Sequence, residues 1–222
     1  MRKSYSALFI EKNKVLISSC IALIFFYIMG IVTVTDPQTR EMATLVILPG
    51  LIANALLLML FFREKLTSRS ALVFALIAIA GFAIEVVGVQ TGDIFGAYSY
   101  GDSLGIKIAE TPLIIGINWL LITYMSASLY ESTNWHTGLK VGAAALTMVV
   151  YDMAMEASAP LLDMWHWQQG KVPAQNYIAW FIVAYIFQTI LHKADVKINN
   201  PIAPLLLLFQ FLFFLVIAMI IH

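Results

Sequence analysis

Residues 139–160 read LKVGAAALTMVVYDMAMEASAP, an apolar run that carries two carboxylic acids near its end. A helix that crosses a bilayer needs about 20 mostly apolar residues, and residues 139–159 meet that length. Asp152 and Glu156 stand four residues apart, so they share one face of a helix. A charge at the bilayer centre costs roughly 2.5–3.5 kcal/mol on insertion scales, so such acids suggest a functional site. The stretch therefore predicts a membrane helix with a buried acidic face.

The rest of the chain repeats this apolar pattern. Of its 222 residues, 61% are hydrophobic and only 12% are charged, and the mean hydropathy is +0.85. This composition is typical of a polytopic membrane protein. The apolar run after Lys14 is too long for the core of a signal peptide, so we expect it to be the first membrane helix. We predict an all-α fold, a single transmembrane domain over residues 1–222 that is a bundle of seven membrane helices at 15–35, 44–62, 70–91, 111–130, 139–159, 175–192 and 203–221.

Lysine and arginine are unevenly shared between the two sides of the predicted bundle. Three of them fall on one side, namely Arg40, Lys107 and Lys171. Ten fall on the other side, namely Arg2, Lys3, Lys12, Lys14, Arg63, Lys65, Arg69, Lys140, Lys193 and Lys197. Basic residues accumulate in cytoplasmic loops. We therefore expect a multi-pass protein of the cell's inner (cytoplasmic) membrane, with a cytoplasmic N-terminus and the C-terminus outside.

Composition and spacing exclude several classes of protein. A net charge of zero gives no reason to expect a nucleic-acid partner. Cys20 is the single cysteine and the four histidines are scattered, so we expect no metal site, and nothing signals a cofactor. Residues 203–221 contain no lysine, which excludes a retinal protein with a Schiff base in its last helix. The chain has no Asp-rich motif of the kind that binds Mg²⁺ and a diphosphate in prenyl transferases.

Polar residues from three predicted helices fall at one depth. At a rise of 1.5 Å per residue, Glu85 lies about 10 Å from the outer end of its helix, and Asn118 about 9 Å. Asp152 and Glu156 lie about 12 and 6 Å from theirs. Helices of opposite direction thus place polar groups in the same outer layer. Two carboxyl groups this close in a low dielectric cannot both ionise cheaply, so we expect at least one to hold its proton.

Structural and transport roles remain open beside a catalytic one. Each acid could form a hydrogen bond between helices, and a water-lined ion path could also use acids at this depth. However, no basic residue lies at that depth, and the acids gather near one end instead of spanning the bilayer. Gly81, Gly88 and Gly92 share the helix face of Glu85. Their smooth surface suits either helix packing or the approach of a flat ligand.

Two longer connections, 92–110 and 160–174, bring aromatic residues to the same outer layer. Interfacial aromatic belts are common in membrane proteins, but Trp135 is the only tryptophan toward the cytoplasmic side. This asymmetry favours an aromatic-walled cavity. The residues expected to line it are Phe95, Tyr98, Tyr100, Asn118, Trp119, Trp165, Trp167, Asn176 and Trp180.

Several motifs together resemble a known family. GFAIEVVGVQTG, FGAYSYGDSLG, YDMAME, WHW and VPAQNYIAWF are similar to stretches of the carotenoid biosynthesis family of membrane-bound carotenoid hydratases, over roughly residues 81–181. The resemblance implies addition of water to the terminal 1′,2′ double bond of an acyclic ψ-end, giving a tertiary alcohol. Two departures concern the acidic helix. Glu156 stands where the family has a second aspartate followed at once by proline, and Tyr151 where members often have tryptophan.

The chemistry implied by this resemblance is that of a hydro-lyase without a cofactor. Protonating an unactivated alkene needs a neutral acid, and a carboxyl kept protonated by apolar surroundings is a suitable donor. We assign this role to Asp152, with ionised Glu156 or Glu85 orienting the attacking water, and the three acids can exchange these roles. Aromatic faces stabilise a cation by about 0.5–2 kcal/mol each. The candidates for this stabilisation are Trp119, Tyr98 and Trp165.

The expected partners are a hydrophobic polyene substrate, the lipid bilayer and other enzymes of the carotenoid pathway. Two rivals stay open. A lycopene-type cyclase would use the same acid but exclude water, so that an internal double bond captures the cation. A non-catalytic carotenoid-binding protein would explain the aromatic residues and glycines, but not three acids at one depth. The product mass separates the first rival from a hydratase, and conversion by purified protein separates the second.

Overall fold

The structure, a computed structural model, describes the backbone of residues 5–221 and the side chains of residues 14–220. Arg2 and Lys3, two of the basic residues assigned to the cytoplasmic side, lie outside the described residues. The described chain is mostly helical. Its helices are α1 (Tyr5–Thr35), α2 (Arg40–Leu60), α3 (Ser68–Thr91), α4 (Ile114–Ser128), α5 (Thr137–Glu156), α6 (Ala174–Lys193) and α7 (Ala203–Ile221), and its strands are β1 (Tyr98–Tyr100), β2 (Lys107–Ile108), β3 (Thr111–Pro112) and β4 (Trp165–Trp167).

Within the described part, six helices are long and apolar enough to cross a membrane: the Lys14–Thr35 part of α1, and α2, α3, α5, α6 and α7. The fold is therefore a helical bundle of a multi-pass membrane protein. α4 is apolar but has only 15 residues, about 22 Å at the helical rise, against a hydrocarbon core of about 30 Å. The membrane-spanning part of α1, Lys14–Thr35, agrees with the predicted span 15–35, although the helix itself begins at Tyr5. The bounds of the other helices differ from the predicted spans by at most four residues.

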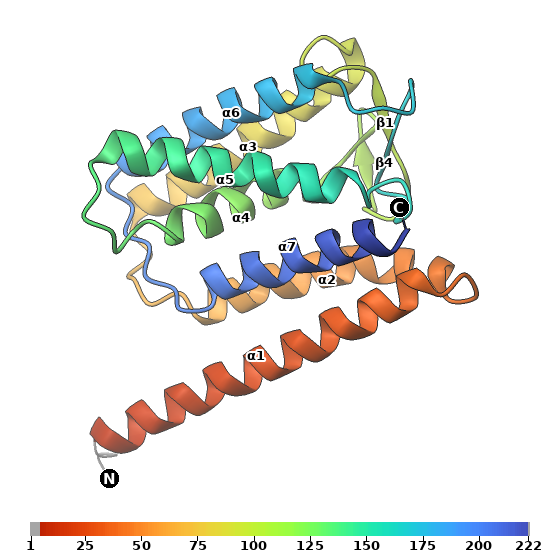
Figure 1. The fold of residues 1–222 in the computed structure, drawn as a ribbon. Coiled ribbons are helices and arrows are strands. Elements are labelled where there is room, and N and C mark those ends of the chain that lie inside the picture. The colour runs from red at the N-terminus through yellow and green to blue at the C-terminus, as the bar shows by residue number, and fades with distance from the viewer. Residues whose placement is uncertain (1–4, 222) are drawn as a thin grey trace.

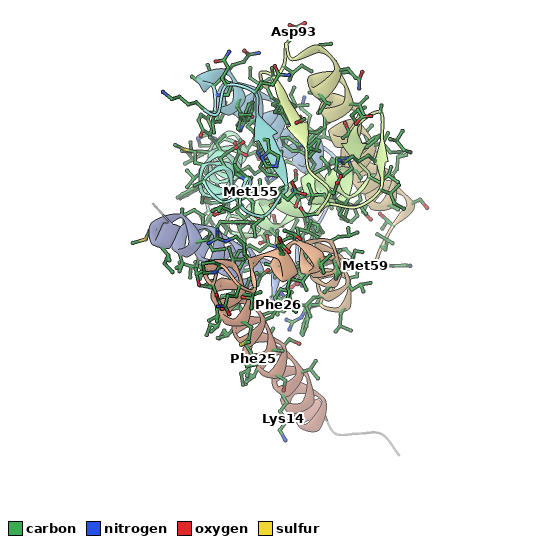
Figure 2. The ribbon with its side chains drawn as sticks, turned by 90° about the vertical axis from the view of Figure 1, so that its right-hand side faces the viewer. Lys14, Phe25, Phe26, Met59, Asp93 and Met155 are labelled. Carbon is green, nitrogen blue, oxygen red and sulfur yellow. The ribbon has the colours of Figure 1, made fainter. Side chains whose placement is uncertain are left out.

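The bundle buries α4 and exposes α1. Eleven of the 15 residues of α4 are buried, and this helix packs against α2, α3, α5, α6 and α7. α1 packs against α2 and α7, and its N-terminal half diverges from the other helices (Figure 1). Phe25 of α1 and Met59 of α2 lie on the periphery in Figure 2, 67% and 73% exposed. Such apolar side chains suit contact with lipid, because no water is available there to penalise them.

The helix α3, which carries Glu85, is capped at both ends. The side chain of Thr67 accepts a hydrogen bond from the backbone N–H of Ser70 at 3.1 Å, and the Ser70 hydroxyl accepts one from the Thr67 N–H at 2.9 Å. This capping box satisfies two N–H groups at the helix start. The helix ends at Thr91, and the next residue, Gly92, has a φ of 71°, a left-handed conformation that suits glycine. The chain then turns back over the bundle end.

Two short antiparallel strand pairs form in the outer connections, which the all-α prediction did not include. β1 pairs with β4, with Tyr98 opposite Trp167 and Tyr100 opposite Trp165. β2 pairs with β3 next to the start of α4. Figure 1 shows β1 and β4 side by side at one end of the bundle, although many residues separate them in sequence. The strand pair therefore joins the two longer connections above the ends of α3 and α5.

Candidate active site

A small cavity of about 30 Å³ lies between α3, α4, α5 and α6 at the bundle end that carries β1 and β4. This space suits one or two water molecules. Figure 2 looks onto this end, with Met155 labelled on α5 and Asp93 in the loop after α3. The structure brings all the sequence-predicted site residues to this one cavity. They are Glu85, Phe95, Tyr98, Tyr100, Asn118, Trp119, Asp152, Glu156, Trp165, Trp167, Asn176 and Trp180, joined by Ile115 and Met155.

Glu85 of α3 is buried and accepts three hydrogen bonds. Its Oε2 accepts from the hydroxyl of Tyr98 and, at 2.8 Å, from that of Tyr100. Its Oε1 accepts from the indole N–H of Trp119 at 2.9 Å. An indole nitrogen only donates, and an ionised carboxylate only accepts. The arrangement therefore matches a carboxylate whose charge is spread over three donors.

Burial and the nearby Glu85 carboxyl raise the pKa of Tyr98 and of Tyr100. Both phenols thus keep their protons throughout the physiological range. They serve as donors to Glu85 and not as bases.

Glu156 of α5 has a matching set of donors from the other strand. Its Oε2 accepts from the indole N–H groups of Trp165 at 3.0 Å and Trp167 at 2.7 Å. Its Oε1 lies 3.4 Å from the side-chain nitrogen of Asn176, which donates to it. Each strand of the β1–β4 pair therefore supplies two aromatic donors to one glutamate. Ser99 and His166, the middle residues of the strands, alternate with these inward-facing rings.

Asp152 differs from the two glutamates. It is fully buried, and its Oδ2 accepts one hydrogen bond from the Asn176 side chain at 2.8 Å. Its Oδ1 has no hydrogen-bond partner among the described residues. A buried carboxylate without further donors is costly, so this acid is best accommodated in its neutral form beside Glu156. Among the three acids of the site, Asp152 is thus the one with an oxygen that accepts no hydrogen bond from a described residue.

The aromatic rings around the acids pack against one another. Trp119 of α4 stacks on Trp180 of α6 with ring centroids 4.1 Å apart. The ring centroids of Tyr98 and Trp167 are 5.1 Å apart. Among residues 14–220, Asn118 lines the cavity without a side-chain hydrogen bond to another residue. The site therefore offers aromatic surface and carboxyl groups. No group of three or more His, Cys, Asp and Glu side chains in the described chain is arranged to hold a metal.

The glycine face of α3 is covered by side chains of this same chain. A Cβ on Gly81 would lie 2.7 Å from the Trp119 Cβ, and one on Gly88 would lie 2.7 Å from the Phe95 ring. Of the two uses left open for these glycines, the structure shows close packing. The absence of side chains at Gly81 and Gly88 lets Trp119 and Phe95 pack closely against α3.

Asp163, which the sequence did not single out, fastens the two outer connections. It has a φ of 51°, and its Oδ2 accepts from the Asp102 N–H at 2.8 Å. Its carbonyl oxygen accepts from the Ser103 hydroxyl at 2.8 Å. The hydrogen bond with His166, at 3.0 Å, lowers the pKa of Asp163.

The pairing of β1 with β4 has a sequence signal in the alternating patterns YSY at 98–100 and WHW at 165–167.

These features define a multi-helix membrane protein with a buried acidic and aromatic site. The sequence model of the carotenoid biosynthesis protein family matches residues 42–222, so the chain belongs to that family and the resemblance inferred from its motifs is confirmed. All of α1 lies before the matched region.

A curated relative is the bisanhydrobacterioruberin hydratase of Haloarcula japonica, which is 24% identical over 127 residues. The match covers 51% of this chain and 42% of the relative, so the chain corresponds to less than half of that protein's length. No solved structure matches the chain.

Proposed function

We propose that the protein is a carotenoid hydratase that adds water across the terminal 1′,2′ double bond of an acyclic ψ-end, giving a tertiary alcohol. Membership of the carotenoid biosynthesis family supports the substrate class, and similarity to a hydratase supports the reaction. The observation that carries the proposal is Asp152, a fully buried acid that lines the cavity with one oxygen unpartnered. A neutral acid of this kind can donate a proton to an alkene.

The proposed reaction has two steps and returns the acid to its starting state. The Asp152 carboxyl donates its proton to the less substituted carbon of the double bond, whose π electrons form the new C–H bond. A tertiary carbocation remains on the neighbouring carbon. A water molecule, oriented by Glu156 or Glu85, forms the C–O bond with its lone pair. Its surplus proton passes to the carboxylate and restores neutral Asp152, so the sum is alkene plus water and no cofactor takes part.

The surroundings of the acids suit a carbocation. Tyr98, Trp119 and Trp165 present rings to the cavity, and an aromatic face stabilises a nearby cation by about 0.5–2 kcal/mol. The hydrogen bonds to Glu85 and Glu156 use polar atoms at the edges of these rings, and one face of Trp119 is covered by Trp180. Two fixed negative charges close to the cation add electrostatic stabilisation without reorganisation during the reaction.

The proposal includes a membrane topology. α4 completes seven crossings of the cytoplasmic membrane, and the N-terminus is cytoplasmic. Arg63, Lys65, Arg69, Lys193 and Lys197 near the inner ends of the helices agree with this orientation. The acids then lie in the outer half of the bilayer, where a polyene dissolved in lipid can reach them laterally. A cavity of about 30 Å³ is too small for a carotenoid end group, so the helices must part to admit one.

Purified protein in detergent, supplied with an acyclic carotenoid, tests the function. The expected product is heavier than the substrate by one water and carries ¹⁸O when the buffer is enriched in H₂¹⁸O. A product of unchanged mass would instead identify a cyclase. Bound but unconverted pigment would identify a carotenoid-binding protein.

Asp152→Asn provides the matched variant, because it keeps the shape of the side chain and removes the acidic proton. Loss of the proton donor should lower the rate about 10²–10⁴-fold. Retention of the normal rate by both Asp152→Asn and Glu85→Gln would refute acid catalysis by this cluster.

A further inference from the structure

Asn176 lies between the two acids of α5. It lies in the first turn of α6 and is 2% exposed. Its single side-chain nitrogen donates to Asp152 Oδ2 at 2.8 Å and to Glu156 Oε1 at 3.4 Å. An amide group has two N–H hydrogens, so one hydrogen is available for each acid. The side chain was predicted to bind substrate, and its hydrogen bonds go to the two acids.

We propose that Asn176 is a positioning residue that decides where the acidic proton sits. An oxygen that accepts a hydrogen bond from an N–H group is the poorer place for a proton, because the proton would point at another donor. Asp152 Oδ2 accepts from Asn176, so the proton occupies Oδ1, the oxygen without a protein partner. Asn176 thereby fixes which oxygen of Asp152 carries the proton. The inference rests on the proposed hydratase function.

The same amide helps Glu156 remain ionised. Glu156 accepts from Trp165, Trp167 and Asn176, whereas Asp152 accepts from Asn176 alone. When two neighbouring carboxyl groups share one proton, the proton stays on the acid with fewer donors. The other titratable groups around the pair are Glu85 on α3, Tyr98 and Tyr100 on β1, Tyr151 on α5 and Tyr177 on α6. None of these donates to Asp152, so Asn176 is the contact that distinguishes its two oxygens.

A second cavity and an apolar groove give no comparable evidence of a function. The cavity among α1, α2, α5 and α7 is lined by Tyr27, Asn54, Tyr151 and Gln210, whose hydrogen bonds to one another account for them as links between helices. The apolar groove beside Phe74 and Tyr124 has nothing that identifies an occupant. The Asn176 arrangement involves an unpartnered buried oxygen and two defined hydrogen bonds.

Infrared spectroscopy of the purified protein tests this placement without requiring turnover. A protonated carboxyl group has a C=O stretching band, and a hydrogen bond to that C=O lowers its frequency. The wild-type protein should show such a band, and Asp152→Asn should remove it. Asn176→Leu should shift it to higher frequency, because Oδ2 loses its donor. In hydration assays Asn176→Leu should lower kcat at least about tenfold and change KM less than about twofold.

Asn54→Leu is the matched control. Asn54 is also a buried asparagine, 5% exposed, and donates to the Tyr27 hydroxyl at 3.0 Å, away from the acids. Both variants lose a buried amide and its hydrogen bonding. Asn54→Leu should leave the infrared band and kcat unchanged. Where Asn176→Leu does not fold, Asn176→Ser serves, because a hydroxyl has one hydrogen and cannot donate to both acids.

The outcomes separate this inference from the proposed function. An unshifted band together with the kcat of the Asn54→Leu control would overturn the role of Asn176, even if the wild-type protein is a hydratase. A shifted band in a protein that converts no acyclic carotenoid would support the placement of the proton and refute the proposed function. A wild-type protein whose band survives Asp152→Asn would overturn the placement directly.

Discussion

Gly81 offers the sharpest test of how the bundle supports the acids. A Cβ on this residue would lie 2.7 Å from the Cβ of Trp119 and 2.8 Å from its Cγ. Trp119 cannot retreat easily, because its ring stacks on Trp180 at 4.1 Å and its N–H donates to Glu85 at 2.9 Å. Gly81→Ala should therefore displace the indole and break or stretch its hydrogen bond to the acid.

The expected change in the free energy of unfolding follows from two opposing effects. Alanine is more favourable than glycine inside a helix by about 0.5–1 kcal/mol, while overpacking a filled site costs about 1–3 kcal/mol. Gly142 of α5 provides the control, because its Cβ would meet no atom within 4 Å. Gly142→Ala should then stabilise the protein, and the two variants should differ by about 1–3 kcal/mol in the free energy of unfolding.

Denaturant unfolding in one detergent, followed by tryptophan fluorescence, measures this difference. The hydration rate, measured in parallel, should fall in Gly81→Ala and stay at the wild-type value in Gly142→Ala. If both alanine variants unfold at the same denaturant concentration and have equal rates, the tight contact between α3 and Trp119 does not support the site.

Three further predictions concern the acids and the strand pair. Glu85→Gln keeps the size of the side chain but removes its charge, so the hydration rate should fall about tenfold or more, and a wild-type rate would exclude a role for that charge. Trp167→Phe keeps a ring but removes the N–H that donates to Glu156 at 2.7 Å; unfolding should become easier by about 1–2 kcal/mol, which chemical denaturation would detect. The hydrogen bond with His166 lowers the pKa of Asp163, so its stabilisation is present above the ordinary aspartate pKa and is lost as pH falls through the lowered one. Asp163→Asn should accordingly flatten the acid side of a plot of melting temperature against pH, and an unchanged plot would contradict this.

The helices could be predicted from the sequence because each is specified locally. Runs of about 20 apolar residues need no partner to be recognised, and all predicted segments correspond to helices. The common depth of the acids could be predicted in the same way, because the depth of a residue in the membrane depends only on its distance along the helix. Their neighbours in the membrane plane depend on packing between helices and could not be derived from one sequence.

Two features could not be predicted from the sequence because each depends on pairing with another segment of the chain. β1 and β4 are three residues long, and each is a strand only because the other pairs with it. The shortness of α4 has a similar origin: Thr111 and Pro112 are apolar enough to extend the predicted helix, but they pair with Lys107 and Ile108 instead. The alternation in YSY and WHW was visible, but three residues give a weak signal. The pattern does not show which glutamate accepts a hydrogen bond from each ring.

The most direct test of the central proposal is hydration carried out in ²H₂O by the purified protein. If Asp152 protonates the terminal double bond, its exchanged deuteron should appear on carbon in the product, next to the carbon that bears the new hydroxyl. Asp152→Asn should give no such product. A hydroxylated product without deuterium on that carbon, or a normal rate in the Asp152→Asn variant, would contradict protonation by this acid.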